Sequence, residues 1–174
     1  FANFATGRVY DQIRQSIAYS HKNVKICASH AGVTLGEDGA THQILEDLGM
    51  MKMLPGFTVI NPCDAQQTKE AAIAIADHDG PVYLRFGRPG WPMFTTPGSF
   101  KIGKAVQFSE GSDVSIFATG HLMWHAIEAG KKLISEGISV DLHNIHTIKP
   151  LDDEAILNSV AKTGCAVSAE EHQR

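Results

Sequence analysis

Cysteine is scarce in this sequence, and the three cysteines present, Cys27, Cys63 and Cys165, lie far apart along the chain. An odd number of widely spaced cysteines does not build a disulfide framework, and two of these lie in apolar runs. That arrangement is typical of reduced, packed thiols in a reducing compartment. We therefore expect a cytoplasmic protein.

The chain also lacks an excess of basic charge and any long apolar run. Its formal net charge is −4, so we expect no nucleic acid as a partner. No apolar stretch has membrane-spanning length and the start shows no signal-peptide pattern, so we expect no membrane partner. With 43% hydrophobic and 20% charged residues, the composition is that of a globular protein with one large or two small domains.

Apolar periodicity in the first half alternates between helix and strand. Asp64 and Gln67 have the spacing of a capping box, which predicts the start of one helix. Strands that alternate with helices indicate parallel βαβ units. The predicted elements are a helix to about 21, a strand over 24–29, a helix over 42–54, a strand over 57–60, a helix over 65–78 and a strand over 82–86.

The segment 88–103 is rich in Pro and Gly and has no sustained period, which is typical of a connector. The alternation then resumes, with predicted strands over 113–119, 139–145 and 165–171 and predicted helices over 121–137 and 152–164. The predicted fold class is α/β, with two tandem parallel-sheet domains over 1–94 and 104–174 joined by a linker over 95–103. Because the chain opens without Met and its last predicted element is a strand, we expect both domains to be incomplete.

The segment 30–43, HAGVTLGEDGATHQ, carries two histidines, a Glu-Asp pair and three glycines but no lysine or arginine. It follows the predicted strand 24–29, and ligands of open parallel sheets bind beyond the carboxyl ends of the strands. The glycine spacing excludes a dinucleotide fingerprint, and the missing lysine excludes a P-loop. The residues therefore predict a loop that binds a polar ligand.

Two other interpretations of this loop remain open. Glu37 and Asp38 could complement the amino end of the next helix, with Thr41 as its N-cap. A zinc site from His30, Asp38 and His42 fits the ligand types, but the spacing matches no common zinc pattern, so we expect no metal ligands here.

Arg85 and Arg88 lie at the carboxyl end of the predicted strand 82–86. Either guanidinium is suited to hold a phosphate or carboxylate in bidentate fashion, and the alternative is two solvated surface arginines. If this segment and the loop 30–43 share one sheet edge, imidazoles, a carboxylate and a guanidinium come together. That combination suits a polyhydroxylated phosphate ester.

SHAGVTLGEDGATHQ resembles the transketolase signature H-x-(S/G)-x-x-x-G-E-D-G-(P/A)-(T/S)-H/Q. The segments ILEDLGMMKMLPG, NPCDAQQTKEA and LRFGRPG continue the likeness in order, and FANF resembles the T-F-x-x-F segment of the same enzymes. The likeness is strong from Phe1 to about Phe94 and weaker over 100–174. It implies a pyrimidine-binding domain followed by a C-terminal domain, as in the C-terminal subunit of a split transketolase or a piece of a full-length enzyme.

This resemblance implies a thiamine-diphosphate-dependent transfer of a two-carbon ketol unit from a ketose phosphate to an aldose phosphate. The family's metal-diphosphate motif and its cofactor-activating glutamate are missing from the sequence. The Mg²⁺ or Ca²⁺ and the diphosphate would therefore be held by an N-terminal diphosphate-binding subunit or domain, without which we expect no activity. The resemblance also implies a homodimer through the pyrimidine and C-terminal domains.

Motif matching assigns roles to six residues. Phe1 and Phe4 would bind the cofactor by packing around its aminopyrimidine ring, and His30 and Arg88 would bind the substrate phosphate.

His30 also belongs to the predicted catalytic set, with Asp38 and His42. Asp38 would accept a hydrogen bond from the C2 hydroxyl of the substrate. His42 would lie near the reacting carbon as a proton donor or polar stabiliser.

Other residues receive supporting or structural roles. We assign Glu37 to loop structure, and Arg85 is expected to supply a supporting charge. Three positions depart from the patterns of some relatives: Ala31, Ala40 and Gly7. We expect the later histidines to be structural, namely His121, His125, His143 and His146.

Four rival functions remain. Deoxyxylulose-phosphate synthases carry G-A-D-G-P-T-H-Q, in which an alanine stands where this chain has Glu37, and β subunits of 2-oxo-acid dehydrogenases lack the GEDG block. A non-catalytic module with the pyrimidine-domain fold is the third alternative, and the intact set of polar site residues argues against it. A phosphate-binding α/β protein would bind the sugar without thiamine diphosphate.

Overall fold

The computed structural model describes residues 1–173. The chain opens with the short helix α1 (Ala2–Ala5), a 3₁₀ turn (Gly7–Val9) and α2 (Tyr10–Ile13), which continues as a π-helical turn (Arg14–Ala18). The single helix predicted to His21 is thus interrupted after its first turn. At the break, the Thr6 hydroxyl donates a hydrogen bond of 2.6 Å to the carbonyl of Ala2 and competes with the helical backbone pattern.

The first sheet contains β1 (Lys25–Ala28), β3 (Val82–Arg85) and β2 (Thr58–Ile60), paired in parallel in the order β1-β3-β2. A fourth strand, β7 (Thr147–Lys149), joins β2 in antiparallel orientation. This strand comes from the second half of the chain and was not predicted, because three residues are too few to show a strand period.

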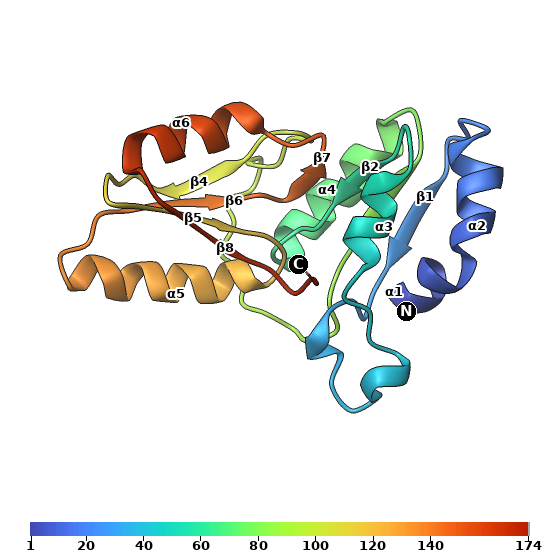
Figure 1. Cartoon of the computed structure of the whole chain (residues 1–174), viewed down its shortest axis with the longest axis horizontal. Helices are drawn as coiled ribbons and strands as arrows, with labels where there is room; N and C mark the ends of the chain where they lie inside the picture. The colour runs from blue at the N-terminus through green and yellow to red at the C-terminus, as the bar shows by residue number, and fades with distance from the viewer. Residues whose placement is uncertain (174) are drawn as a thin grey trace.

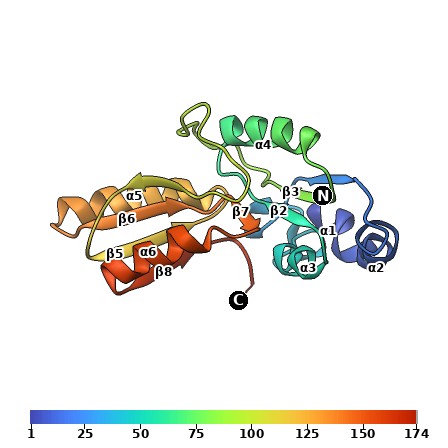
Figure 2. The ribbon, with the colours of Figure 1, turned by 90° about the horizontal axis from the view of Figure 1, so that it is seen from above.

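Helices cover both faces of this sheet (Figure 2). On one face lies α4 (Ala65–Asp77), and on the other lie α1, α2 and α3 (Asp47–Met53). Every residue of β2 and β3 is buried, as expected for strands covered on both faces.

The predicted cap of α4 is confirmed, because the Asp64 carboxylate accepts a hydrogen bond of 2.8 Å from the Gln67 amide. The Gln67 side chain, however, accepts its hydrogen bond of 3.0 Å from the amide of Cys63, one residue before the cap. The cap is therefore as predicted, but the reciprocal bond of the capping box is shifted by one residue.

The predicted helix 42–54 begins late. A 3₁₀ turn (Gly39–Thr41) precedes α3, and Glu46 rather than Thr41 is the N-cap residue. The intervening chain is tied to the preceding loop instead, since the Ile44 carbonyl accepts a hydrogen bond of 3.1 Å from the Gly32 amide. The alternative interpretation in which Thr41 caps this helix was therefore wrong.

The second sheet has the order β4-β6-β5-β8 (Figure 1). The strands are β4 (Val106–Ser109), β5 (Val114–Ala118), β6 (Val140–Asn144) and β8 (Ala166–Ala169). Only β4 is antiparallel to its neighbour. The helices α5 (Leu122–Ser135) and α6 (Asp153–Thr163) cover opposite faces. Two mixed, parallel-dominated sheets confirm the predicted α/β class.

The two halves are joined by buried polar contacts as well as by β7. Asn61, just beyond β2, donates through Nδ2 to the Thr119 hydroxyl at 3.1 Å and accepts at its carbonyl from the Gly120 amide at 3.2 Å. Its own amide donates to the carbonyl of His146 at 2.7 Å. These contacts make the two halves one packed body. The domain boundaries at 94 and 104 stay a prediction.

All three cysteines are free thiols. No helix within residues 1–173 has the length and apolarity needed to cross a membrane.

Candidate active site

The loop 30–43 leaves the carboxyl end of β1 beside the segment that follows β3. The amide of Ala31 donates to the Phe86 carbonyl at 3.3 Å, which confirms that both segments lie at one sheet edge. His30 has a φ of 62° and Gly32 a φ of 83°, so the chain reverses through left-handed backbone conformations.

Four rings gather at this edge. The ring centroid of Phe1 lies 4.3 Å from that of His30 and 5.4 Å from that of His42, and Phe4 lies 5.1 Å from His42. The amide of Ala2 donates to the Ser29 carbonyl at 2.7 Å and so fixes α1 beside the loop. The structure thus brings together both predicted cofactor residues and two of the three predicted catalytic residues.

The two histidines are each oriented by a neighbouring hydroxyl. Nδ1 of His30 lies 2.8 Å from the Ser29 hydroxyl, and Nδ1 of His42 lies 2.8 Å from the Thr41 hydroxyl. Neither Nε2 has a hydrogen-bond partner within residues 1–173. One nitrogen of each imidazole is therefore available to a ligand.

Phe1 is 41% exposed and is the more exposed of the two phenylalanines in this cluster. One face of Phe4 is covered by the Arg8 guanidinium, whose carbon lies 4.0 Å from the ring centroid. Arg8 follows the position, Gly7, where some relatives carry an aromatic residue, and sequence reasoning missed this contact.

Arg88 crosses to the other part of the loop. Its Nη1 donates to the Leu35 carbonyl at 2.9 Å, its Nη2 donates to the Glu37 carboxylate, and Nη1 lies 3.9 Å from Oδ2 of Asp38. The hydrogen bond from Arg88 lowers the pKa of Glu37, and the same bond raises the pKa of Arg88. Glu37 thus acts in loop structure through an ion pair that sequence reasoning did not identify.

Arg85 does not belong to this group. It is 3% exposed and its Nε donates to Oδ2 of Asp47 at 2.8 Å, an oxygen that also accepts from the Tyr83 hydroxyl at 2.7 Å. Its Nη2 donates to the Glu171 carbonyl at 2.9 Å. The predicted supporting charge at the ligand site was wrong, and so was the solvated alternative, because the guanidinium completes a buried ion pair.

The later histidines are mostly buried, in keeping with structural roles. His143 lies 3.2 Å from Asp141, His146 packs against Phe100 with a centroid distance of 4.5 Å, and His125 is exposed. His121 differs from these because it contacts the loop, with its Nε2 3.2 Å from the Thr34 hydroxyl. No group of three or more His, Cys, Asp or Glu side chains within the described chain is arranged to hold a metal ion.

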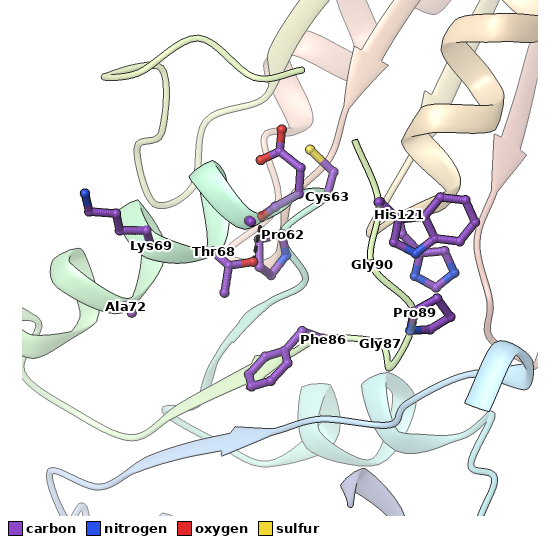
Figure 3. A pocket seen from close by; sticks show the side chains of 13 residues that line it. Pro62, Cys63, Thr68, Lys69, Ala72, Phe86, Gly87, Pro89, Gly90 and His121 are labelled. Carbon is purple, nitrogen blue, oxygen red and sulfur yellow. Dashed lines mark hydrogen bonds between the residues drawn. The ribbon is translucent and has the colours of Figure 1, made fainter. Parts of the chain in front are cut away.

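A cleft of about 490 Å³ lies between α4 and the connector, beside the loop edge (Figure 3). In Figure 3, His121, Pro89 and Gly90 line one side of this cleft, and Thr68 and Lys69 lie opposite. None of the six predicted site residues lines it. The candidate site is instead the open surface formed by the rings and charges of the loop 30–43.

Histidines, acids and an arginine lie at the carboxyl edge of the parallel sheet, with paired phenylalanines beside them. This is the architecture of a pyrimidine-binding domain. The family model for the transketolase pyrimidine-binding domain matches residues 1–92, and the model for the transketolase C-terminal domain matches residues 103–174. The chain belongs to the transketolase family and resembles its C-terminal part.

Curated relatives support this assignment. The chain is 43% identical over 171 residues to a 6-deoxy-6-sulfo-D-fructose transketolase subunit of Clostridium sp. (strain MSTE9), covering 98% of this chain and 53% of the relative. It is 37% identical over 175 residues to an apulose-4-phosphate transketolase subunit of Phocaeicola vulgatus, covering 99% and 56%. The chain therefore spans about half the length of these relatives.

A 1-deoxy-D-xylulose-5-phosphate synthase of Geobacter sulfurreducens is 34% identical over 168 residues, covering 95% of this chain but 26% of the synthase. Among solved structures, a split-gene transketolase described as an inactive β4 tetramer superposes with a TM-score of 0.91 at 43% identity, covering 99% of this chain and 56% of that one.

Proposed function

We propose that this chain forms half of the active site of a thiamine-diphosphate-dependent transketolase that transfers a two-carbon ketol unit between sugar phosphates. The observation that carries the proposal is the joining of Phe1, Phe4, His30 and His42 in one ring cluster. The family membership supports the reaction class, and the distinct sugars in the relatives' names leave the ketose donor open.

The residues present fit the aminopyrimidine end of this cofactor. A flat heteroaromatic ring stacks on aromatic side chains, and Phe1, which is 41% exposed, lies with its ring centroid 5.4 Å from that of Phe4. When bound, thiamine diphosphate supplies the electron sink for cleaving a carbon–carbon bond next to a carbonyl. Its diphosphate and a divalent metal would be held by a separate diphosphate-binding subunit or domain.

The remaining residues bind and orient the sugar phosphate. Arg88 and His30 hold the phosphate by charge-assisted hydrogen bonds. Asp38, which is 38% exposed in its side chain, accepts a hydrogen bond from the sugar's C2 hydroxyl. His42 donates or accepts a proton at its free Nε2 near the reacting carbon.

A coupled assay for glyceraldehyde 3-phosphate release from xylulose 5-phosphate and ribose 5-phosphate tests the proposal. The full-length subunit is assayed with thiamine diphosphate and Mg²⁺, with and without the diphosphate-binding subunit of the same source. We expect turnover only when both chains are present. No turnover from a folded, associated pair would overturn the proposal.

The Asp38→Ala variant tests the site itself. Because a hydrogen bond to a charged group contributes about 1.5–3 kcal/mol, we expect kcat/KM to fall about 10- to 100-fold. The matched control is Asp79→Ala, another exposed aspartate in the turn after α4, which should leave kcat/KM unchanged. Equal losses in the two variants would contradict the role of Asp38.

A further inference from the structure

The loop 30–43 is anchored by the second half of the chain as well as by its own sheet. Glu171, which lies just beyond β8, accepts two hydrogen bonds from Thr34 in the middle of the loop. Its Oε1 accepts from the Thr34 amide at 3.2 Å and its Oε2 accepts from the Thr34 hydroxyl at 3.0 Å. The two residues are 137 positions apart in the sequence.

His121, at the start of α5, completes this contact. Its Nε2 lies 3.2 Å from Oε2 of Glu171 and 3.2 Å from the Thr34 hydroxyl, and its ring stacks on Trp91 with a centroid distance of 4.9 Å and an interplanar angle of 6°. Burial alone would raise the pKa of Glu171, but hydrogen bonds from His121 and Thr34 and the charge of Arg85 outweigh it and lower that pKa. Glu171 is therefore a charged, buried acceptor.

The position of Glu171 is itself fixed. Its carbonyl accepts from Nη2 of Arg85 at 2.9 Å, and the amide of Gln173 donates to the Leu45 carbonyl at 2.6 Å. Gly32 packs against the carboxylate so closely that a Cβ at this position would overlap Oε2. Position 32 therefore has room for glycine alone beside the Glu171 carboxylate.

We propose that Glu171 and His121 are positioning residues of the active site, holding the loop 30–43 in its binding conformation through Thr34. The expected change in KM rests on the proposed function, whereas the conformation of the loop does not. Leu35, next to Thr34, supplies the carbonyl that holds Arg88, and His30 lies four residues before Thr34. Loss of the contact frees both phosphate-binding residues, so the KM for the sugar phosphate rises more than kcat falls.

Thr34→Val and Glu171→Gln in the full-length subunit test this inference. Thr34→Ser keeps the hydroxyl and should rescue the loop, and Glu170→Gln is the matched control, since Glu170 is an exposed neighbouring carboxylate. Hydrogen–deuterium exchange over 32–43 is measured on the subunit alone. The KM and kcat are then measured with the diphosphate-binding subunit.

For Thr34→Val and Glu171→Gln we expect loop exchange faster by about fivefold or more, with β1 and β3 unchanged. We expect the KM to rise about tenfold and kcat to change less than about threefold, because misplaced binding groups act chiefly on substrate affinity. If loop exchange is unchanged in Thr34→Val and Glu171→Gln, the inference is overturned. It is also overturned if Glu170→Gln or Thr34→Ser raises the KM as much as these two variants do. If the wild-type pair shows no turnover, the proposed function fails, and exchange alone decides the positioning role.

Discussion

The buried pair of Arg85 and Asp47 gives the sharpest test of the fold. Arg85 is 3% exposed and Asp47 is fully buried. Within residues 1–173, only the Tyr83 hydroxyl would remain to bond the Asp47 carboxylate if the guanidinium were removed. Arg85→Met keeps much of the side-chain volume but leaves an uncompensated buried carboxylate. Removing one partner of a buried pair costs about 3–5 kcal/mol, which is the loss in free energy of unfolding that we expect.

Urea unfolding of the purified chain, followed by circular dichroism, measures this loss. For a chain of this size the same loss corresponds to a fall in Tm of roughly 6–20 °C. Arg88→Met is the matched control. Its ion pair with Glu37 is exposed and screened by solvent, so its removal should lower the free energy of unfolding far less than Arg85→Met does.

The double variant Asp47→Leu/Arg85→Met separates an unpaired charge from lost packing. Replacing both partners of a buried pair by apolar residues is often nearly neutral, so the double variant should be more stable than Arg85→Met. The reasoning is refuted if the double variant is as unstable as Arg85→Met. It is also refuted if Arg85→Met is no less stable than Arg88→Met.

Two further predictions concern His146 and Glu37. Burial lowers the pKa of His146 to about 4, whereas an unfolded histidine titrates near 6.5. The unfolded chain therefore binds the extra proton first, and the free energy of unfolding should fall by about 3 kcal/mol as the pH drops from above 6.5 to 4. Urea titrations across this range should show a smaller fall for His146→Gln, and an equal fall would contradict the assignment. Glu37→Gln removes the charged partner that helps to hold Arg88 in the loop, so the KM for the sugar phosphate should rise about two- to tenfold in the coupled assay. A lowered KM would show that Glu37 instead competes with the phosphate for Arg88.

The sequence predicted the parts of the molecule whose causes are local. The cap at Asp64 depends on an amide three residues away, and the position of the loop 30–43 follows from the rule that parallel strands place their carboxyl ends at one edge. Local chemistry also made Thr41 a reasonable N-cap for α3. The hydrogen bond between Gly32 and Ile44 overrode it by holding that segment in the loop.

The missed features depend on partners remote in sequence. Arg85 could not be placed in the core without its partner Asp47, 38 positions away, although an aspartate inside the apolar run ILEDLGMMKML was a signal of buried pairing. The contact between Thr34 and Glu171 joins residues 137 positions apart, so no local pattern predicts it. Periodicity reports which face of an element is buried, and it does not report which polar group lies on that face.

The strand β7 has a consequence for any attempt to divide this polypeptide. Because β7 pairs with β2, one edge strand of the first sheet consists of residues that lie more than 80 positions after β2 in the sequence. A piece ending at the connector would expose the backbone amides and carbonyls of β2 as an open edge, a template for self-association. The two halves therefore depend on each other for solubility as well as for packing, and a division point that preserves the first sheet must keep 147–149 with it.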